Sequence, residues 1–181
     1  MSTIHVGDVA PDFTKSDLFG NVVKLSDYRG KRVILCFFRF ATCPFCTVRY
    51  ARMLQEAERF ASADVQVIAV FESHADYIKK YLSKRGMPFP VIADPEGELY
   101  RLYALKRSFW GFLIGMMRIN AVIKALLDKH YRMAIPDADM LRIPADFLID
   151  AEQIVVDGYY GRDIGDHIPF RDIDAFVDGT A

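Results

Sequence analysis

The 181-residue sequence lacks an excess of charge of either sign, because 23 Lys and Arg residues face 24 Asp and Glu residues. This balance gives no reason to expect binding to nucleic acid. The sequence also lacks a long apolar run: the uncharged stretch from Ser108 to Met117 is too short to span a bilayer. No basic stretch followed by an apolar core opens the chain, which argues against a secretory signal.

Cysteine is scarce as well, with three residues in all, Cys36, Cys43 and Cys46. Three cysteines do not make a disulfide scaffold, and in a reducing compartment a close pair is typical of a catalytic or metal-binding site. A tetrahedral zinc needs two further ligands, and there is no second C-x-x-C and no cluster among the four scattered histidines. No nucleotide-binding glycine loop or flavin motif is found, so we expect no metal and no organic cofactor. The compartment we expect is the cytoplasm.

What the sequence does contain is an alternation of short apolar runs with amphipathic stretches, bounded by Gly, Pro and Asp turns. This order predicts an α/β fold with one mixed central β-sheet flanked by helices, in a single domain over residues 1–181. The elements we expect are an N-terminal β-hairpin within 6–24, strands at 32–40, 64–71, 89–93 and 147–149, a hairpin at 154–160, and helices at 44–60, 75–84, 98–105 and 168–177.

The segment 108–135 fits no step of this alternation, and we interpret it as a helical insertion. It is apolar and carries Trp110 beside the basic residues Arg118 and Lys124. Three roles stay open. It could form an extra core layer or a homodimer face, line a pocket for an apolar or lipid-derived substrate, or lie on a membrane surface.

The chemistry is indicated by Cys43-Pro44-Phe45-Cys46, which follows an apolar strand and opens a helix. Proline is well suited to the first helical position. A helix N-terminus offers unpaired N–H groups and a positive dipole end, which lower a thiol pKa from ~8.5 to roughly 3.5–7.5. Cys46, one turn further, would be close enough to form a disulfide with Cys43. The spacing therefore predicts a redox-active dithiol.

Three stretches carry a family resemblance: FFRFATCPFC at 37–46, GDVAPDF at 7–13 and IPADFLID at 143–150, with DPEGELYRLY at 94–103 in support. Together they resemble the peroxiredoxin-like AhpC/TSA proteins of the thioredoxin superfamily. The resemblance implies a thioredoxin-like fold and the reduction of hydroperoxides or disulfides. It also implies a thioredoxin-type reductant.

The sequence departs from the peroxiredoxin pattern Pro-x-x-x-Thr-x-x-Cys. If Cys46 takes the place of the peroxidatic cysteine, Arg39 stands at the proline position and Cys43 at the threonine position. The family's active-site arginine falls on Pro144, which instead resembles the cis-proline that faces the dithiol of thioredoxins. Arg39 or Arg142 could replace the missing arginine by holding a thiolate electrostatically.

Two registers therefore remain for the nucleophile. The thioredoxin register makes Cys43 the attacking thiol and Cys46 the resolving one, whereas the peroxiredoxin register brings the peroxide to Cys46. We favour Cys43 because we expect it to be the more exposed. Cys36 is expected in the core, and Asp166-His167 is interpreted as a cap or surface pair.

The function predicted from the sequence is that of a thiol-dependent oxidoreductase acting on hydroperoxides or disulfides. The alternative is a non-catalytic redox sensor or adaptor that binds a partner or a membrane surface through the segment 108–135.

Overall fold

A five-stranded sheet forms the centre of the computed structural model, which describes residues 2–128, 131–132 and 134–180. Its strand order is β5-β4-β3-β6-β7, and a separate two-stranded hairpin pairs β1 with β2. The strands are β1 Thr14–Ser16, β2 Val22–Lys24, β3 Arg32–Phe38, β4 Val65–Phe71, β5 Val91–Ala93, β6 Ala145–Ile149 and β7 Val155–Tyr160. The helices are α1 Pro44–Gln55, α2 Ala57–Ser62, α3 Ala75–Leu82, α4 Glu98–Leu102, α5 Phe109–Met116, α6 Ile119–Leu127 and α7 Phe170–Val177, with 3-10 turns η1 Leu25–Tyr28 and η2 Ser83–Arg85.

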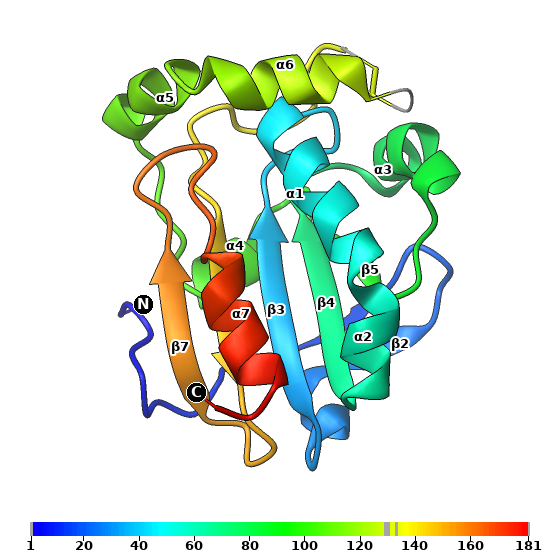
Figure 1. Ribbon diagram of the computed structural model, residues 1–181, viewed down its shortest axis with the longest axis vertical. Coiled ribbons are helices and arrows are strands. Elements are labelled where there is room, and N and C mark those ends of the chain that lie inside the picture. The colour runs from blue at the N-terminus through cyan, green and yellow to red at the C-terminus, as the bar shows by residue number, and fades with distance from the viewer. Residues whose placement is uncertain (1, 129–130, 133, 181) are drawn as a thin grey trace.

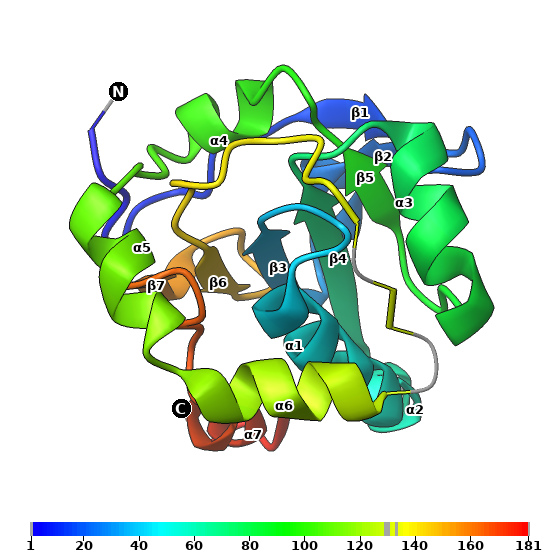
Figure 2. The same cartoon turned by 90° about the horizontal axis from the view of Figure 1, so that it is seen from above.

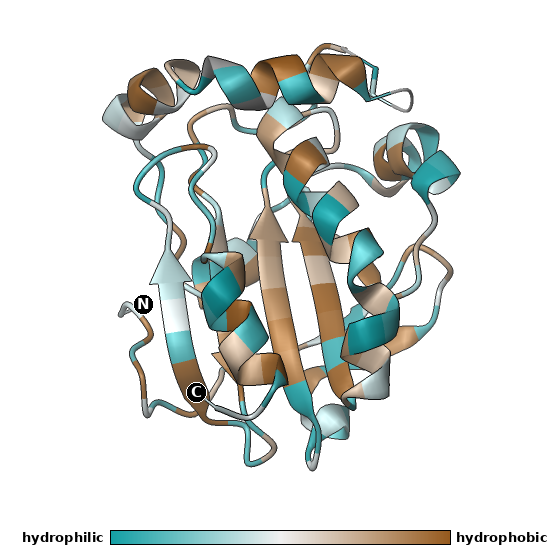
Figure 3. Cartoon of the chain, viewed as in Figure 1, coloured by the Kyte–Doolittle hydropathy of each residue, from teal (hydrophilic) through white to brown (hydrophobic). Residues whose placement is uncertain are grey.

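The central strands are apolar on both faces because helices cover both faces. β3 pairs in parallel with β4 and antiparallel with β6, so that Leu35 lies opposite Ile68 on one side and Phe147 on the other. Helices α1, α2 and α7 lie on one face of the sheet, and α4 and the β1–β2 hairpin lie on the other (Figure 1). Hydropathy follows this layering, with β3 and β4 almost uniformly apolar (Figure 3). The predicted mixed sheet and thioredoxin-like architecture are confirmed.

Two details differ from the sequence prediction. The helix expected over 44–60 is interrupted at Glu56, which ends α1 and precedes α2. The hairpin expected at 154–160 is instead one strand, β7, which pairs antiparallel with β6.

The segment 108–135 contains α5 and α6, which lie across the end of the sheet toward which β3 and β4 point (Figures 1 and 2). α6 packs against α1. α5 approaches the 162–165 loop closely, since a Cβ on Gly115 would lie 2.2 Å from Ile164 Cγ1. Part of the segment's apolar surface faces solvent, including Trp110 and Met117, which are 73% and 82% exposed. Within the described part of the chain, no helix is long and apolar enough to cross a membrane.

Candidate active site

The dithiol lies where the central strand β3 passes into helix α1. Cys43 is the N-cap residue, with extended backbone angles (φ −66°, ψ 123°), and Pro44 occupies the first helical turn. The carbonyl of Cys43 already accepts the first helical hydrogen bond, from the N–H of Thr47 at 2.9 Å. Cys46 therefore stands one turn into the helix, as the C-x-x-C spacing predicts.

Arg39, the first residue after β3, contacts both sulfur atoms. Its guanidinium Nη1 donates to Cys43 Sγ at 3.3 Å, and its backbone N–H donates to Cys46 Sγ at 3.3 Å. A second guanidinium nitrogen, Nη2, donates to the carbonyl of Met140, and the group lies 4.9 Å from the centre of the Phe40 ring. The guanidinium is thus fixed against the sulfur of Cys43.

These surroundings separate the two thiols in acidity. Burial alone would raise the pKa of Cys43, but the Cys46 thiol, the Arg39 charge and the N–H groups of Cys46 and Phe45 outweigh it and lower the pKa to about 6. Burial raises the pKa of Cys46 well above its ordinary value, and the neighbouring Cys43 adds to that rise. These shifts favour the thiolate form of Cys43 near neutral pH, with the Cys46 thiol as its hydrogen-bond donor.

Exposure does not distinguish the two cysteines, contrary to the expectation from the sequence. Cys43 is 0% and Cys46 is 1% exposed. The preference for Cys43 therefore rests on charge and hydrogen bonding, not on access to solvent.

Residues from the end of the segment 108–135 and just beyond it cover the dithiol loop. Tyr131 Oη donates to the carbonyl of Thr42 at 3.3 Å, and Tyr77 Oη donates to the carbonyl of Ile135. Asp137 accepts from Ser73 Oγ at 2.6 Å and from the His74 N–H at 3.0 Å. With the Arg39–Met140 bond, these contacts tie residues 131–140 to the dithiol loop and to the segment 73–77.

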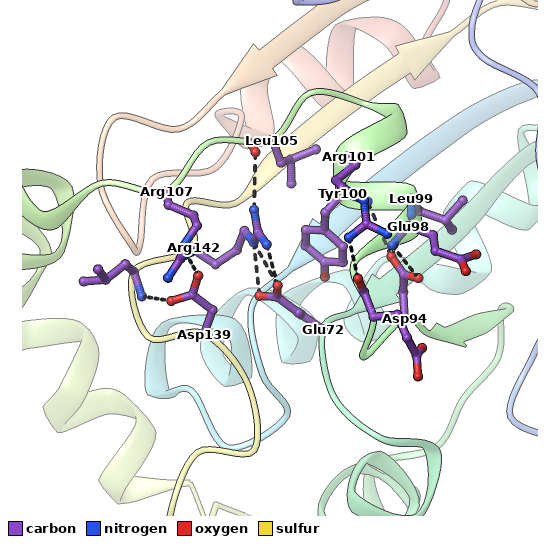
Figure 4. Close-up of polar contacts among 12 residues, drawn as sticks. Glu72, Asp94, Glu98, Leu99, Tyr100, Arg101, Leu105, Arg107, Asp139 and Arg142 are labelled. Atoms are coloured by element: carbon purple, nitrogen blue, oxygen red, sulfur yellow. Dashed lines mark hydrogen bonds and ion pairs between the residues drawn. The ribbon is translucent and has the colours of Figure 1, made fainter. Parts of the chain in front are cut away.

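Arg142, the other candidate for a thiolate-holding cation, is engaged elsewhere. It forms a buried ion pair with Glu72, with Arg142 Nε 3.1 Å from both carboxylate oxygens, and it also donates to the carbonyl of Leu105 (Figure 4). Its guanidinium lies 5.1 Å from the centre of the Tyr100 ring. Among the described residues, Arg39 and not Arg142 donates to a cysteine sulfur.

Pro144 precedes β6, but it does not have the cis peptide bond expected from its likeness to the thioredoxin proline. The peptide bonds of the described chain are all trans. The carbonyl of Pro144 accepts from the Gly161 N–H at 3.0 Å, which ties the entry of β6 to the end of β7. The expectation of a cis-proline was wrong.

Cys36 is buried in β3 as expected, but it borders a charged cluster that the sequence interpretation missed. Asp146, opposite Cys36 in the sheet, is fully buried. Its Oδ2 lies 2.9 Å from His167 Nδ1 and 3.8 Å from Arg49 Nη2, and it accepts from the Ile168 N–H at 2.9 Å.

The cluster corrects the interpretation of Asp166-His167 as a surface pair. The His167 side chain is buried against Asp146, while Asp166 accepts from Arg162 and Tyr159. Burial would raise the pKa of Asp146, but His167, Arg49 and the Ile168 N–H lower it to about 2. An aspartate inside an otherwise apolar strand was the available sequence signal, since such residues are almost never buried without partners.

A metal-binding arrangement does not emerge from the part of the chain that the structure describes. It contains no group of three or more His, Cys, Asp or Glu side chains placed to hold an ion. All three cysteines are free thiols.

Comparison with known proteins matches residues 6–157 to the model of the AhpC/TSA family. The chain is 31% identical over 134 residues to peroxiredoxin Bcp of Bacillus subtilis, which covers 72% of this chain and 83% of that protein. Among solved structures, peroxidoxin BcpB of Mycobacterium tuberculosis superposes with a TM-score of 0.69 at 18% identity, covering 98% of this chain and 99% of that one. A protein of Chlorobium tepidum assigned as the thiol:disulfide interchange protein DsbE gives a TM-score of 0.65 at 26% identity, covering 97% and 99%.

Proposed function

The chain belongs to the AhpC/TSA family, and from that premise we propose that it is a thiol-dependent oxidoreductase that reduces hydroperoxides or disulfides, with Cys43 as nucleophile and Cys46 as resolving thiol. One observation carries the assignment of roles. The sulfur of Cys43 accepts from the Arg39 guanidinium and has a pKa of about 6, whereas the pKa of Cys46 is raised. The thiolate is the reactive form of cysteine.

With a hydroperoxide, the Cys43 thiolate attacks one peroxide oxygen and the O–O bond breaks. The departing oxygen takes up a proton from solvent and leaves as an alcohol, or as water when the substrate is hydrogen peroxide, and Cys43 becomes a sulfenic acid. The Cys46 thiol then attacks the Cys43 sulfur, water leaves, and a disulfide joins the two residues. With a disulfide substrate, the same thiolate forms a mixed disulfide that Cys46 resolves.

The cycle closes when an external dithiol supplies two electrons to the Cys43–Cys46 disulfide. We propose a thioredoxin-type protein for this step and a cytoplasmic setting, where thiols are kept reduced. A homodimer or membrane contact through the segment 108–135 stays a prediction.

The sensor or adaptor alternative is not favoured. An adaptor needs no thiolate at neutral pH, yet Arg39, the Cys46 thiol and the N–H groups of the first helical turn all lower the pKa of Cys43. A redox sensor also uses a low-pKa thiol, and against it stands the 31% identity of the chain to peroxiredoxin Bcp of Bacillus subtilis. Perturbed acidity of this kind clusters at catalytic sites.

The test is the consumption of hydrogen peroxide and of an organic hydroperoxide by the reduced protein, with thioredoxin and its reductase as electron source. We expect Cys43→Ser to lower the rate by on the order of 1,000-fold or more, because it removes the nucleophile. Cys46→Ser should keep the first, stoichiometric reaction and lose turnover.

Cys36→Ser is the matched control, because Cys36 is also a buried thiol but lies in β3, outside the dithiol loop. It should retain most of the activity. If Cys46→Ser removes the first reaction and Cys43→Ser retains it, the assigned roles are reversed. If the protein reduces neither peroxides nor a model disulfide faster than a free thiol does, the proposed function fails.

A further inference from the structure

A pocket of about 290 Å³ lies on the side of α1 that faces the loop before α7. Helix α1 contributes Phe45, Arg49 and Arg52 to its walls, and the 165–170 segment contributes His167 and Phe170. Arg39, Cys43 and Cys46 do not line the pocket, although Phe45 belongs to the C-x-x-C motif itself. The proposed function makes no use of this pocket.

Two buried side chains in its walls have polar atoms without partners. Arg49 is 9% exposed, and its Nη1 donates to the Ile168 carbonyl at 2.9 Å, but neither Nε nor Nη2 has a hydrogen-bond acceptor among the described residues. His167 uses Nδ1 on Asp146, and its buried Nε2 has no partner in the same set. Buried N–H groups of a charged side chain are costly to leave unpaired. These atoms are buried in the unliganded protein, so a pocket ligand that accepts hydrogen bonds from them must displace the side chains that cover them.

The charge of the pocket favours an anion as that acceptor. Arg49, Arg52 and Arg118 line it, against one carboxylate, Asp166. Arg118 is already paired with Asp163 at 2.7 Å and lies 3.5 Å from Asp166. Arg52 has no ion pair among the described residues, and its guanidinium lies 4.0 Å from the centre of the Phe170 ring. Arg49 shares a buried ion pair with Asp146, with 3.8 Å between Nη2 and Oδ2, so Arg52 supplies the unpaired charge of the pocket and Arg49 supplies N–H groups that lack hydrogen-bond acceptors among the described residues.

The rest of the lining is apolar and comes from the side chains of Phe45, Val48, Ile168, Pro169 and Phe170. A small inorganic anion would leave this surface without a partner, and a neutral apolar molecule would leave Arg49 unsatisfied. A carboxylate is matched by a guanidinium in planar, two-bond geometry. The volume is near the lower end of the range for small-molecule sites.

We propose that this pocket binds an amphiphilic monocarboxylate, with its carboxylate on Arg49 and Arg52 and its apolar tail against Phe45 and Phe170. The inference goes beyond the proposed function and does not depend on it, because no cysteine takes part in binding. A fatty acid and an arylalkanoic acid both present this chemistry.

The experiment is isothermal titration of the reduced full chain with octanoate and with 3-phenylpropanoate, alongside octanol, acetate and inorganic phosphate. We expect at least one of the two amphiphilic carboxylates to bind at one site, and octanol, acetate and phosphate to bind at least tenfold more weakly than it does. The tighter of the two carboxylates identifies the tail as aliphatic or aromatic. Amide NMR spectra should show the largest shifts at Phe45, Gly165 and Ile168.

Arg52→Ala is the informative variant, because Arg52 is exposed and its loss should leave the fold intact. It should weaken binding roughly tenfold, as expected for the loss of a charge-assisted hydrogen bond. Arg171→Ala is the matched control, since Arg171 is also exposed and adjoins Phe170 but lies outside the pocket lining.

Three results would overturn the proposal. The first is that neither carboxylate shows saturable binding. The second is that octanol or phosphate binds as tightly as the carboxylates. The third is that Arg52→Ala binds the carboxylate as tightly as the unsubstituted chain does. The same titration on a Cys43→Ser/Cys46→Ser variant should give unchanged affinity. If the double variant binds the carboxylate and the unsubstituted chain has no peroxidase activity, the proposed function is contradicted and the binding proposal stands.

Discussion

Two buried arginines near the start of α1 have different partners. Arg39 gives one guanidinium nitrogen to the Cys43 sulfur and another to the Met140 carbonyl, and only its Nε lacks a hydrogen bond within the described chain. Arg49 gives one nitrogen to the Ile168 carbonyl and leaves both Nε and Nη2 without acceptors there, with Asp146 at 3.8 Å.

The comparison shows that a buried arginine can have two different roles, depending on the anion that it faces. At Arg39 the anion is a thiolate, so the guanidinium sets the acidity of a reactive group. At Arg49 the anion is a fully buried carboxylate shared with His167, so the guanidinium compensates a structural charge and has N–H groups to spare. The first arrangement supports chemistry and the second supports stability and, as we propose, ligand binding.

The largest effect is expected from Asp146→Asn, which removes the structural anion. Taking away one partner of a buried ion pair typically costs roughly 3–5 kcal/mol in the free energy of unfolding. Because the pKa of Asp146 is lowered from 3.8 to about 2, its contribution is complete above pH ~4 and is lost as the pH falls toward 2. Chemical denaturation between pH 3 and pH 7 measures this.

The difference in stability between the unsubstituted chain and Asp146→Asn should therefore shrink as the pH is lowered. The pKa of Cys43 should stay near its value in the unsubstituted chain, because the main causes that lower it are the Cys46 thiol, Arg39 and the N–H groups of Cys46 and Phe45. A difference that grows toward pH 3 would contradict the role given to this carboxylate.

The next effect is expected from Arg39→Gln, which removes the cation from the thiolate. The pKa of Cys43 should rise by roughly 1–3 units, and the rate of peroxide reduction at neutral pH should fall about tenfold. Ultraviolet absorbance of the thiolate measures the pKa, and stopped-flow kinetics measure the rate.

Arg142→Gln is the matched control for this change, because it removes a largely buried arginine that is paired with Glu72 instead. It should cost stability and leave the pKa of Cys43 in place. An equal rise in pKa in both variants would mean that Arg39 has no specific role.

The smallest effect is expected from Gly115→Ala. This substitution should displace Ile164, which belongs to the loop before α7, and the same loop lines the pocket beside Arg49. The new Cβ would lie 2.2 Å from Ile164 Cγ1, so the loop must shift. Overpacking outweighs the helix-propensity gain of alanine, and we expect a net loss of about 1–2 kcal/mol. Thermal unfolding measures this loss. Met117→Ala is the control, because Met117 is exposed, and it should change the free energy of unfolding by no more than about 0.5 kcal/mol. Unchanged stability in Gly115→Ala would show that α5 does not pack closely there.

The strand–helix junction could be predicted from sequence because its signals are local. An apolar run, a cysteine at the cap and Pro44 at the first helical turn lie within a few residues of one another, and each favours the same geometry. The mixed sheet followed from the alternation of elements in the same way.

The surroundings of the dithiol could not be predicted, since they depend on residues distant in the chain. Tyr131 lies 89 residues from Thr42, and Met140 lies 101 residues from Arg39. The contacts of Tyr131 and Met140 with the dithiol loop depend on where the chain returns after α6, which no local pattern specifies. The pairing of Asp146 with His167 is likewise a product of the tertiary fold, although a charge in an apolar strand was a hint.

The central claim is that Cys43 is a thiolate near neutral pH, and its titration is the most direct test. In a Cys36→Ser background, absorbance at 240 nm is followed as the reduced protein is brought from pH 4 to pH 9. The account predicts that one thiolate appears with a midpoint at about pH 6. This titration should be absent in Cys43→Ser. It should remain in Cys46→Ser with a higher midpoint, because the Cys46 side chain helps to lower the pKa of Cys43. No thiolate below pH 8, or a titration that survives Cys43→Ser unchanged, would contradict it.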